Sequence, residues 1–126
     1  MDKLKFIKEQ MEAAGIPYEF GEWTSPVVYP YSVGEITEDP IETEDGAEQS
    51  TLILTVFHRG KFIALEEFKQ SVKRLFPPVY GLRGQTEGGG AIAVFYDGSF
   101  PVPSGEAELR KIQVNIKIKE WKGAIE

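Results

Sequence analysis

The stretch KIQVNIKIKE, residues 111–120, constrains the fold more than any other part of the chain, because apolar and polar side chains alternate in it strictly. Its apolar side chains are Ile112, Val114, Ile116 and Ile118. Successive side chains of a strand point to opposite faces, so this alternation predicts a strand with one face in the core and the other in water. The buried face of such a sheet has to be covered by other elements of the chain.

Two segments have the apolar spacing of helices that could provide this cover. In residues 2–14, apolar side chains recur every three or four positions, and Gly15 and Pro17 follow as a stop signal. In residues 65–75, apolar positions again recur at helical spacing between charged residues, and Pro77-Pro78 ends the pattern. We therefore expect two amphipathic helices.

The first half of the chain also predicts three strands. Residues 18–23 form a short one, and the prolines that follow delay the next until about Tyr31, from which it runs through Ile41. Asp45-Gly46 is a strong hairpin signal, because both residues accept the positive φ of a tight primed turn. The strand after it, residues 51–59, has two nearly apolar faces, which is typical of a central strand covered on both sides.

The second half of the chain is less regular. Residues 79–90 contain much glycine and little apolar pattern, so we expect a mobile loop there. AIAVFY, residues 91–96, predicts a strand, and Asp97-Gly98 predicts a turn. Pro101 and Pro103 exclude a central strand from the outgoing arm, which is expected to be an edge or a projecting hairpin.

These elements predict an α+β fold in the order α-β-β-β-α-β-β. Two α-helices are expected on one face of an antiparallel or mixed β-sheet, with a projecting β-hairpin or loop. The 126 residues suit a single domain, residues 1–126.

Composition and charge exclude several classes of function. The chain has no cysteine, so it has no disulfide and no thiolate metal site. It has no apolar window of 18 residues and no signal-peptide pattern, so we expect no membrane partner. Its net charge of −6 is opposite to the basic excess of proteins that bind duplex DNA. The acid is concentrated in residues 35–48, which include Glu42, Glu44 and Asp45 and contain no Lys or Arg.

No motif for catalysis or cofactor binding is found. His58 is the only histidine, and no G-x-S-x-G, H-E-x-x-H or second histidine accompanies it. The acidic stretch does not match the ligand positions of a calcium-binding EF-hand loop. The run Gly88-Gly89-Gly90 is followed by a predicted strand, not by the helix N-terminus that a phosphate site needs. We therefore expect no catalytic residue, no metal and no cofactor.

These features suit a component of an assembly better than an enzyme. Aromatic side chains such as Tyr96 and Phe100 are enriched at protein interfaces. A basic face of the last strand, with Lys117 and Lys119, and an acidic loop on the same molecule can meet head to tail, and such contacts close into rings where the rotation permits. Two alternatives stay open: a small α+β ligand-binding or regulatory module with an apolar pocket, and a hydrolase built on His58 and a carboxylate.

The sequence also resembles the small tail-terminator, or tail-completion, proteins of tailed bacteriophages and prophages. The similar stretches are the opening helix, YPYSVGEI, STLILTVFHRGKFIALEEFKQSVKRLF and PVPSGEAELRKIQVNIKIKEWKG. The resemblance implies an α+β fold and a hexameric ring that caps the tail tube and joins it to the head-neck complex. It implies a virion-tail location after assembly in the cytoplasm of a bacterial host, and it provides no catalytic residue.

The implied partners are further copies of the chain, the tail tube protein and the head-neck connector protein, with DNA only as passing cargo. On this interpretation His58 and Arg59 lie at a strand-to-helix corner with a structural or interface role. Tyr96, Phe100, Lys117 and Lys119 are the other candidate interface residues. Glu42, Glu44 and Asp45 would line the lumen, where their charge would repel passing DNA.

Overall fold

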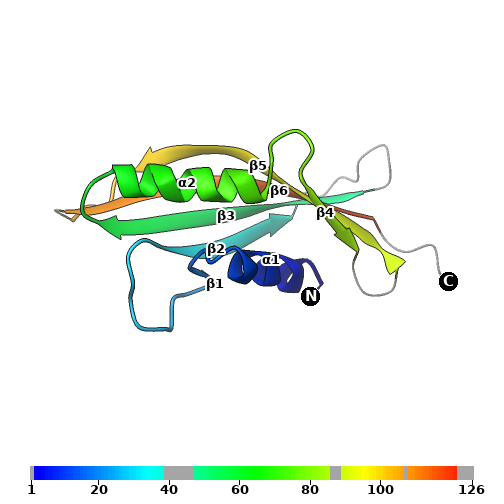
Figure 1. The fold of residues 1–126 in the computed structure, drawn as a ribbon, viewed down its shortest axis with the longest axis horizontal. Helices are drawn as coiled ribbons and strands as arrows, with labels where there is room; N and C mark the ends of the chain where they lie inside the picture. The colour runs from blue at the N-terminus through cyan, green and yellow to red at the C-terminus, as the bar shows by residue number, and fades with distance from the viewer. Residues whose placement is uncertain (1, 39–46, 86–88, 107, 122–126) are drawn as a thin grey trace.

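One mixed sheet of six strands organises the molecule (Figure 1). The structure is a computed structural model that describes residues 2–38, 47–85, 89–106 and 108–121. The strands are β1 (Tyr18–Phe20), β2 (Tyr31–Glu38), β3 (Glu48–Arg59), β4 (Leu82–Gln85), β5 (Ala91–Val102) and β6 (Leu109–Trp121). Their order in space is β1-β2-β3-β6-β5-β4; β1 and β2 pair in parallel, and every other neighbouring pair is antiparallel.

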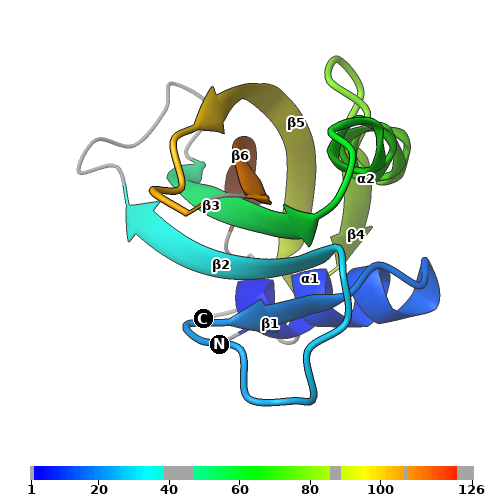
Figure 2. The same ribbon diagram turned by 90° about the vertical axis from the view of Figure 1, so that its left-hand side faces the viewer.

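Both helices lie on the same face of this sheet, as the sequence predicts (Figures 1 and 2). Helix α1 (Asp2–Ala13) lies beside β1 and β2, and helix α2 (Ile63–Leu75) contacts β3, β5 and β6. Ile7 and Met11 of α1 and Leu65 and Val72 of α2 are fully buried in one apolar core with the sheet. The predicted α+β architecture, with two helices on one face, is confirmed.

The alternating stretch of the last strand forms the centre of the core. Its apolar side chains face the helices and stand opposite the even-numbered side chains of β3, as in the pairs Leu52–Ile116 and Leu54–Val114. All four of these residues have no exposed surface. Complete burial of a side chain of this size stabilises a fold by about 1.5–3 kcal/mol, so this double row contributes strongly to stability.

The strand β3 is central, but its two faces differ. The helices cover only the face that carries Leu52, Leu54 and Val56. On the other face Ile53 and Phe57 are half-buried, with no layer of the described structure above them. The prediction of cover on both sides is therefore wrong, and the second apolar face has to be explained by other contacts.

A further strand, β4, lies inside the segment for which we expected a loop. Leu82–Gln85 pairs antiparallel with the start of β5, and Leu82 contacts the core. Gly84 has a packing role that composition does not show, since a Cβ at this position would clash with the ring of Phe6 on α1. The glycine lets the helix approach the edge of the sheet, so a residue that argued against a strand is required by its packing.

The turn predicted at Asp97-Gly98 is wrong, because β5 continues through it. The register between β5 and β6 shifts between Tyr96 and Ser99, which makes this point a β-bulge. Beyond the bulge, Pro101 pairs with Ile112 of β6, while β4 pairs only with Ala91–Val94. The proline-containing arm therefore pairs with β6 on one side only, which makes it an edge of the described sheet, as the sequence predicts.

The acidic turn predicted at Asp45-Gly46 lies outside the described residues. The strands on either side of it pair antiparallel, from Tyr31 opposite Phe57 to Glu38 opposite Ser50.

Candidate interaction surfaces

Five ring side chains form a continuous group around the start of β2 and the end of β3; we call Trp23, Tyr29, Tyr31, Phe57 and His58 the aromatic strip. Tyr31 and Phe57 belong to the face of the sheet that the helices leave open, whereas His58 follows Phe57 in β3 and belongs to the other face. The ring centroids of Trp23 and Tyr31 are 4.8 Å apart, and those of Tyr31 and Phe57 are 5.0 Å apart in a stacked arrangement. Tyr29 lies 5.7 Å from Tyr31 and 6.3 Å from His58. These separations are those of favourable aromatic pairs.

The strand register explains why the strip forms. Tyr31 of β2 stands directly opposite Phe57 of β3, and Phe57 stands opposite Lys111 of β6. The ammonium group of Lys111 lies 5.9 Å from the centre of the Phe57 ring, within the range of a cation–π interaction. The half-buried state of Phe57 on the open face therefore has a local cause.

His58 and Arg59 lie where the sequence places them, at the corner between β3 and α2. The Nδ1 atom of His58 is shielded from water and has no hydrogen-bond partner among the described residues. Arg59 donates from Nε to the Tyr29 hydroxyl at 3.2 Å and forms an ion pair with Glu106 at 3.1 Å. The hydrogen bond that Arg59 donates to Tyr29, then the one that it donates to Glu106, raises the pKa of Arg59. His58 is paired with no carboxylate among the residues that the structure describes, so these residues give no geometric support to a hydrolase centred on it.

Tyr96 and Phe100 are separate from this corner and from each other. Tyr96 packs against the core on the helix side, shares a hydrogen bond of 2.9 Å with the Ser99 hydroxyl, and has Lys73 of α2 above its ring at 5.4 Å. Phe100 follows the bulge and is 47% exposed. The bulge lies between the two residues, so Tyr96 packs against the core and Phe100 lies at the surface.

The lysines of β6 lie on the open face together. Lys117 stands opposite Thr51, and Lys119 stands opposite Gln49. All odd-numbered side chains of this part of β6 are half-buried, and between the lysines and the aromatic strip the Oδ1 atom of Asn115 is shielded without a partner in the described structure. Glu42, Glu44 and Asp45, the predicted lumen residues, lie outside the described residues.

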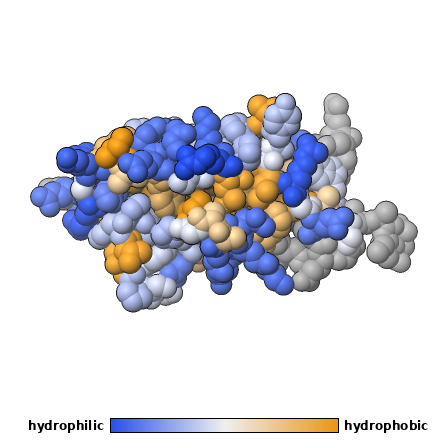
Figure 3. Space-filling view, viewed as in Figure 1, coloured by the Kyte–Doolittle hydropathy of each residue, from blue (hydrophilic) through white to orange (hydrophobic). Residues whose placement is uncertain are grey.

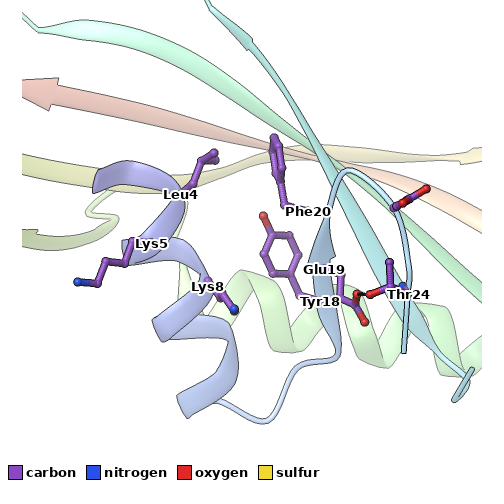
Figure 4. Close-up of a pocket in the computed structure, with 8 residues that line it drawn as sticks. Leu4, Lys5, Lys8, Tyr18, Glu19, Phe20 and Thr24 are labelled. Carbon is purple, nitrogen blue, oxygen red and sulfur yellow. Dashed lines mark hydrogen bonds between the residues drawn. The ribbon is translucent and has the colours of Figure 1, made fainter. Parts of the chain in front are cut away.

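A groove of about 600 Å³ runs between α1 and β1 (Figure 4). Leu4 and Lys8 line it from the helix, and Tyr18, Glu19 and Phe20 line it from the strand. It is open and carries charges on both sides, unlike the mostly apolar pocket of a typical small-molecule site. Nothing in it resembles an acid–base pair.

Two residues of this groove have shifted pKa values with structural causes. The side chain of Ser25, then the backbone and side chain of Thr24, donate to Glu19 and lower its pKa to about 2. Burial raises the pKa of Tyr18 to about 12, and its hydroxyl has no partner among the residues described. Both shifts favour the ordinary charge states at neutral pH.

The sequence reasoning missed an exposed apolar turn between α2 and β4. Val79 and Tyr80 are 76% and 77% exposed, the highest values among the large hydrophobic residues described. The turn rises away from the body of the molecule, and the same face shows further orange apolar side chains at its left-hand end (Figures 1–3). The stretch PPVYG, residues 77–81, indicates such a turn, because two prolines and a glycine surround two large apolar residues.

No group of three or more His, Cys, Asp or Glu side chains is placed to hold a metal ion within the described ranges. Neither α1 nor α2 has the length and the apolar character needed to cross a membrane.

Comparisons with known proteins give a structural result. No protein-family model matches the sequence, and no curated protein matches it. Among solved structures, the chain is similar to a chain of the virion of a native gene transfer agent particle, with a TM-score of 0.59. The match covers 89% of this chain and 84% of the other at 9% sequence identity. At this identity the likeness concerns the fold.

Proposed function

We propose that the protein is a non-catalytic structural component of a phage or phage-like particle, and that it forms the ring which terminates the tail tube. The observation that carries the proposal is the shared fold with a chain of a gene transfer agent virion over most of both chains. The sequence resemblance to tail terminators points in the same direction. The partners are then further copies of the chain, the tail tube protein and the head-neck connector protein, and the location is the virion tail.

The surfaces of the molecule are compatible with a ring. A ring of identical subunits needs two different patches on each subunit, because its contacts are heterologous. The aromatic strip with Arg59, the lysine face with Lys117 and Lys119, and the apolar surface around Phe100 are three such patches on different parts of the fold. Tyr and Arg are typical of residues that dominate binding energy at interfaces.

The acidic residues Glu42, Glu44 and Asp45 have a role in this proposal that follows from charge. DNA passes through a tail-terminator ring, and an acidic lumen would prevent it from binding to the wall. The head-to-tail attraction between acidic and basic parts of neighbouring subunits would weaken as salt screens the charges.

The first test is the mass of the purified protein by light scattering over a concentration series at low and moderate salt. A species of six chains, or an equilibrium between one and six chains, is expected. The second test uses particles from a strain that lacks the gene: electron microscopy should show tails of irregular length without attached heads. Normal particles in that strain would contradict the proposal whatever the mass in solution.

The groove between α1 and β1 supports a second candidate, a ligand-binding module without catalysis. Its volume of about 600 Å³ would admit a small molecule, and Lys8 and Glu19 provide charged groups in its lining. A thermal-shift screen of metabolites distinguishes the two candidates. Specific stabilisation that Lys8→Ala removes would favour the module, and its absence together with assembly would favour the ring.

A further inference from the structure

The exposed turn after α2 is held rigidly. The amide of Gly81 donates to the carbonyl of Pro77 at 2.9 Å, and Arg83 donates to the carbonyl of Tyr80 at 3.3 Å. Gly81 has a φ of +68° and approaches the ring of Phe95 so closely that a Cβ would lie 2.7 Å from it. Val79 and Tyr80 are therefore presented by a fixed backbone, and we call them the knob.

An exposed, preorganised apolar turn has the properties of an interface anchor. Ordering a flexible loop costs binding free energy, and this turn is already ordered. Tyrosine is among the residues that most often dominate an interface, since its ring is apolar and its hydroxyl can pair at the edge. The knob contributes nothing to the core of the chain, because Val79 and Tyr80 are each more than three quarters exposed.

A shallow depression of about 200 Å³ lies near the other end of α2. We call it the socket, and its apolar lining comes from the residue before α2, the arm of β5 and β6: Phe62, Phe100, Pro101 and Ile112. Glu66 and Lys69, an ion pair at 2.7 Å, provide polar groups within the socket. Apolar walls with a polar rim are what a tyrosine side chain requires of a binding site.

The knob and the socket cannot meet within one chain. Helix α2, with 13 residues, separates them by about 20 Å at 1.5 Å per residue. Two complementary patches at different places on one molecule give a heterologous contact between copies, and such contacts close into a ring or extend into a filament.

The charges along α2 favour the same arrangement. Residues 72–85, which include the knob, contain Lys73, Arg74 and Arg83 and no acidic residue. At the socket end, α2 carries the acidic residues Glu66 and Glu67, and Lys69 is paired with Glu66. Two bases precede the helix, Lys61 and Arg59, of which Arg59 is paired with Glu106. Docking the knob of one copy into the socket of the next brings the basic end of one α2 to the acidic end of another.

We propose that Val79 and Tyr80 of each copy dock into the Phe62–Phe100 socket of a second copy of the same chain. The inference rests on the proposed function, since it names the contact that joins neighbours in the ring. A partner other than a second copy is a different outcome of the test below.

The absence of cysteine makes cross-linking a clean test. Tyr80→Cys and Phe62→Cys are prepared as separate proteins, mixed and oxidised. We expect a disulfide-linked dimer in the mixture and in neither protein alone, and a ladder of linked chains from the variant that carries both substitutions. Val28→Cys with Phe62→Cys is the matched control, because Val28 is also exposed and lies on another loop; this pair should give no dimer.

A second measurement covers variants without cysteine. Val79→Ser with Tyr80→Ser should raise the concentration needed for assembly at least tenfold in light scattering, while Val27→Ser with Val28→Ser should not change it.

A dimer from Tyr80→Cys alone would overturn the proposal, because it would show a symmetric contact. An oligomer of wild-type mass without the mixed cross-link would overturn it and leave the ring function intact. A monomer at every concentration, or cross-linking of Tyr80→Cys in particles only to another protein, would also overturn it.

Discussion

Gly15 and Gly81 share a backbone conformation and differ in their surroundings, which makes them a matched pair for separating two costs. Their φ values are +71° and +68°, and a Cβ at Gly15 would meet nothing within 4 Å. A Cβ at Gly81 would lie 2.7 Å from the Phe95 ring and 2.9 Å from the Val94 carbonyl. Position 15 therefore reports the cost of the left-handed conformation, and position 81 adds the cost of the clash.

We expect Gly15→Ala to lower the free energy of unfolding by about 1–2 kcal/mol, the usual cost of this conformation for a residue with a Cβ. Gly81→Ala should lower it by roughly a further 1–3 kcal/mol, because inserted atoms force packed neighbours to move. Urea unfolding of the two variants measures both losses of unfolding free energy. Equal losses would show that the chain around Phe95 relaxes at no cost.

Glu19 gives a pH-dependent prediction at the same scale. Its pKa in the folded protein is about 2, below the ordinary value of 4.5, because Ser25 and Thr24 donate to its carboxylate. A depressed pKa means that the stabilisation is present above about pH 4.5 and is lost as the pH falls through 2. Glu19→Gln should therefore destabilise the protein at pH 7 and have little effect near pH 2, as measured by urea unfolding at both values. Glu22→Gln, in the loop directly after β1, is the control; an equal loss from it would point to a general charge effect.

At the scale of the elements, the regular patterns of the sequence decided most of the fold. Strict alternation predicted β6, and helical spacing predicted α1 and α2, since each pattern reports one buried face. The patterns failed at two glycines, one that makes room for a contact distant in sequence and one that lies in a β-bulge. Gly84 lies under Phe6, and Gly98 lies in a bulge of a continuous strand, so both looked like loop or turn residues.

The candidate surfaces were predictable to a lesser degree for a similar reason. The corner position of His58 and Arg59 followed from the strand and helix patterns. The aromatic strip depends on which residues stand opposite each other in neighbouring strands, and one chain's sequence does not specify this register. The knob was missed because glycine content described residues 79–90 as a loop without indicating that the turn is held rigidly.

The aromatic strip gives a prediction about how β2 and β3 are joined. Tyr31 and Phe57 are stacked across the strands, so a double-mutant cycle with Tyr31→Ala and Phe57→Ala should give a coupling of about 0.5–1.5 kcal/mol in urea unfolding. A cycle of Tyr31→Ala with Phe95→Ala should give a coupling near zero, because Phe95 pairs with β6 at a distant position. Zero coupling in the first cycle would mean that the strip adds nothing beyond the burial of each ring.

At the scale of the whole molecule, the distribution of charge has two consequences that can be separated. The open face of the sheet carries Lys111, Lys117 and Lys119 on β6, whereas the sequence between residues 35 and 48 carries only acid. If the lysines and the acidic residues acted only through the net charge of −6, the position of a charge substitution would make no difference to its effect. If a ring forms around DNA, reversing charge at the lumen should matter and reversing it elsewhere should not.

The variant with Glu42→Lys, Glu44→Lys and Asp45→Lys tests this difference against a variant with Glu9→Lys, Glu12→Lys and Glu22→Lys. Both variants change the net charge by the same amount, and the control residues are exposed on α1 and the loop after β1. We expect the first variant to keep the mass of the wild type and to gain DNA binding that weakens steeply with salt, since each neutralised phosphate releases counterions. The control should bind DNA far less in the same fluorescence-anisotropy assay. Equal binding by both variants would assign the effect to net charge and remove the acidic residues from the lumen, while leaving the ring and its contacts to the tests that address them.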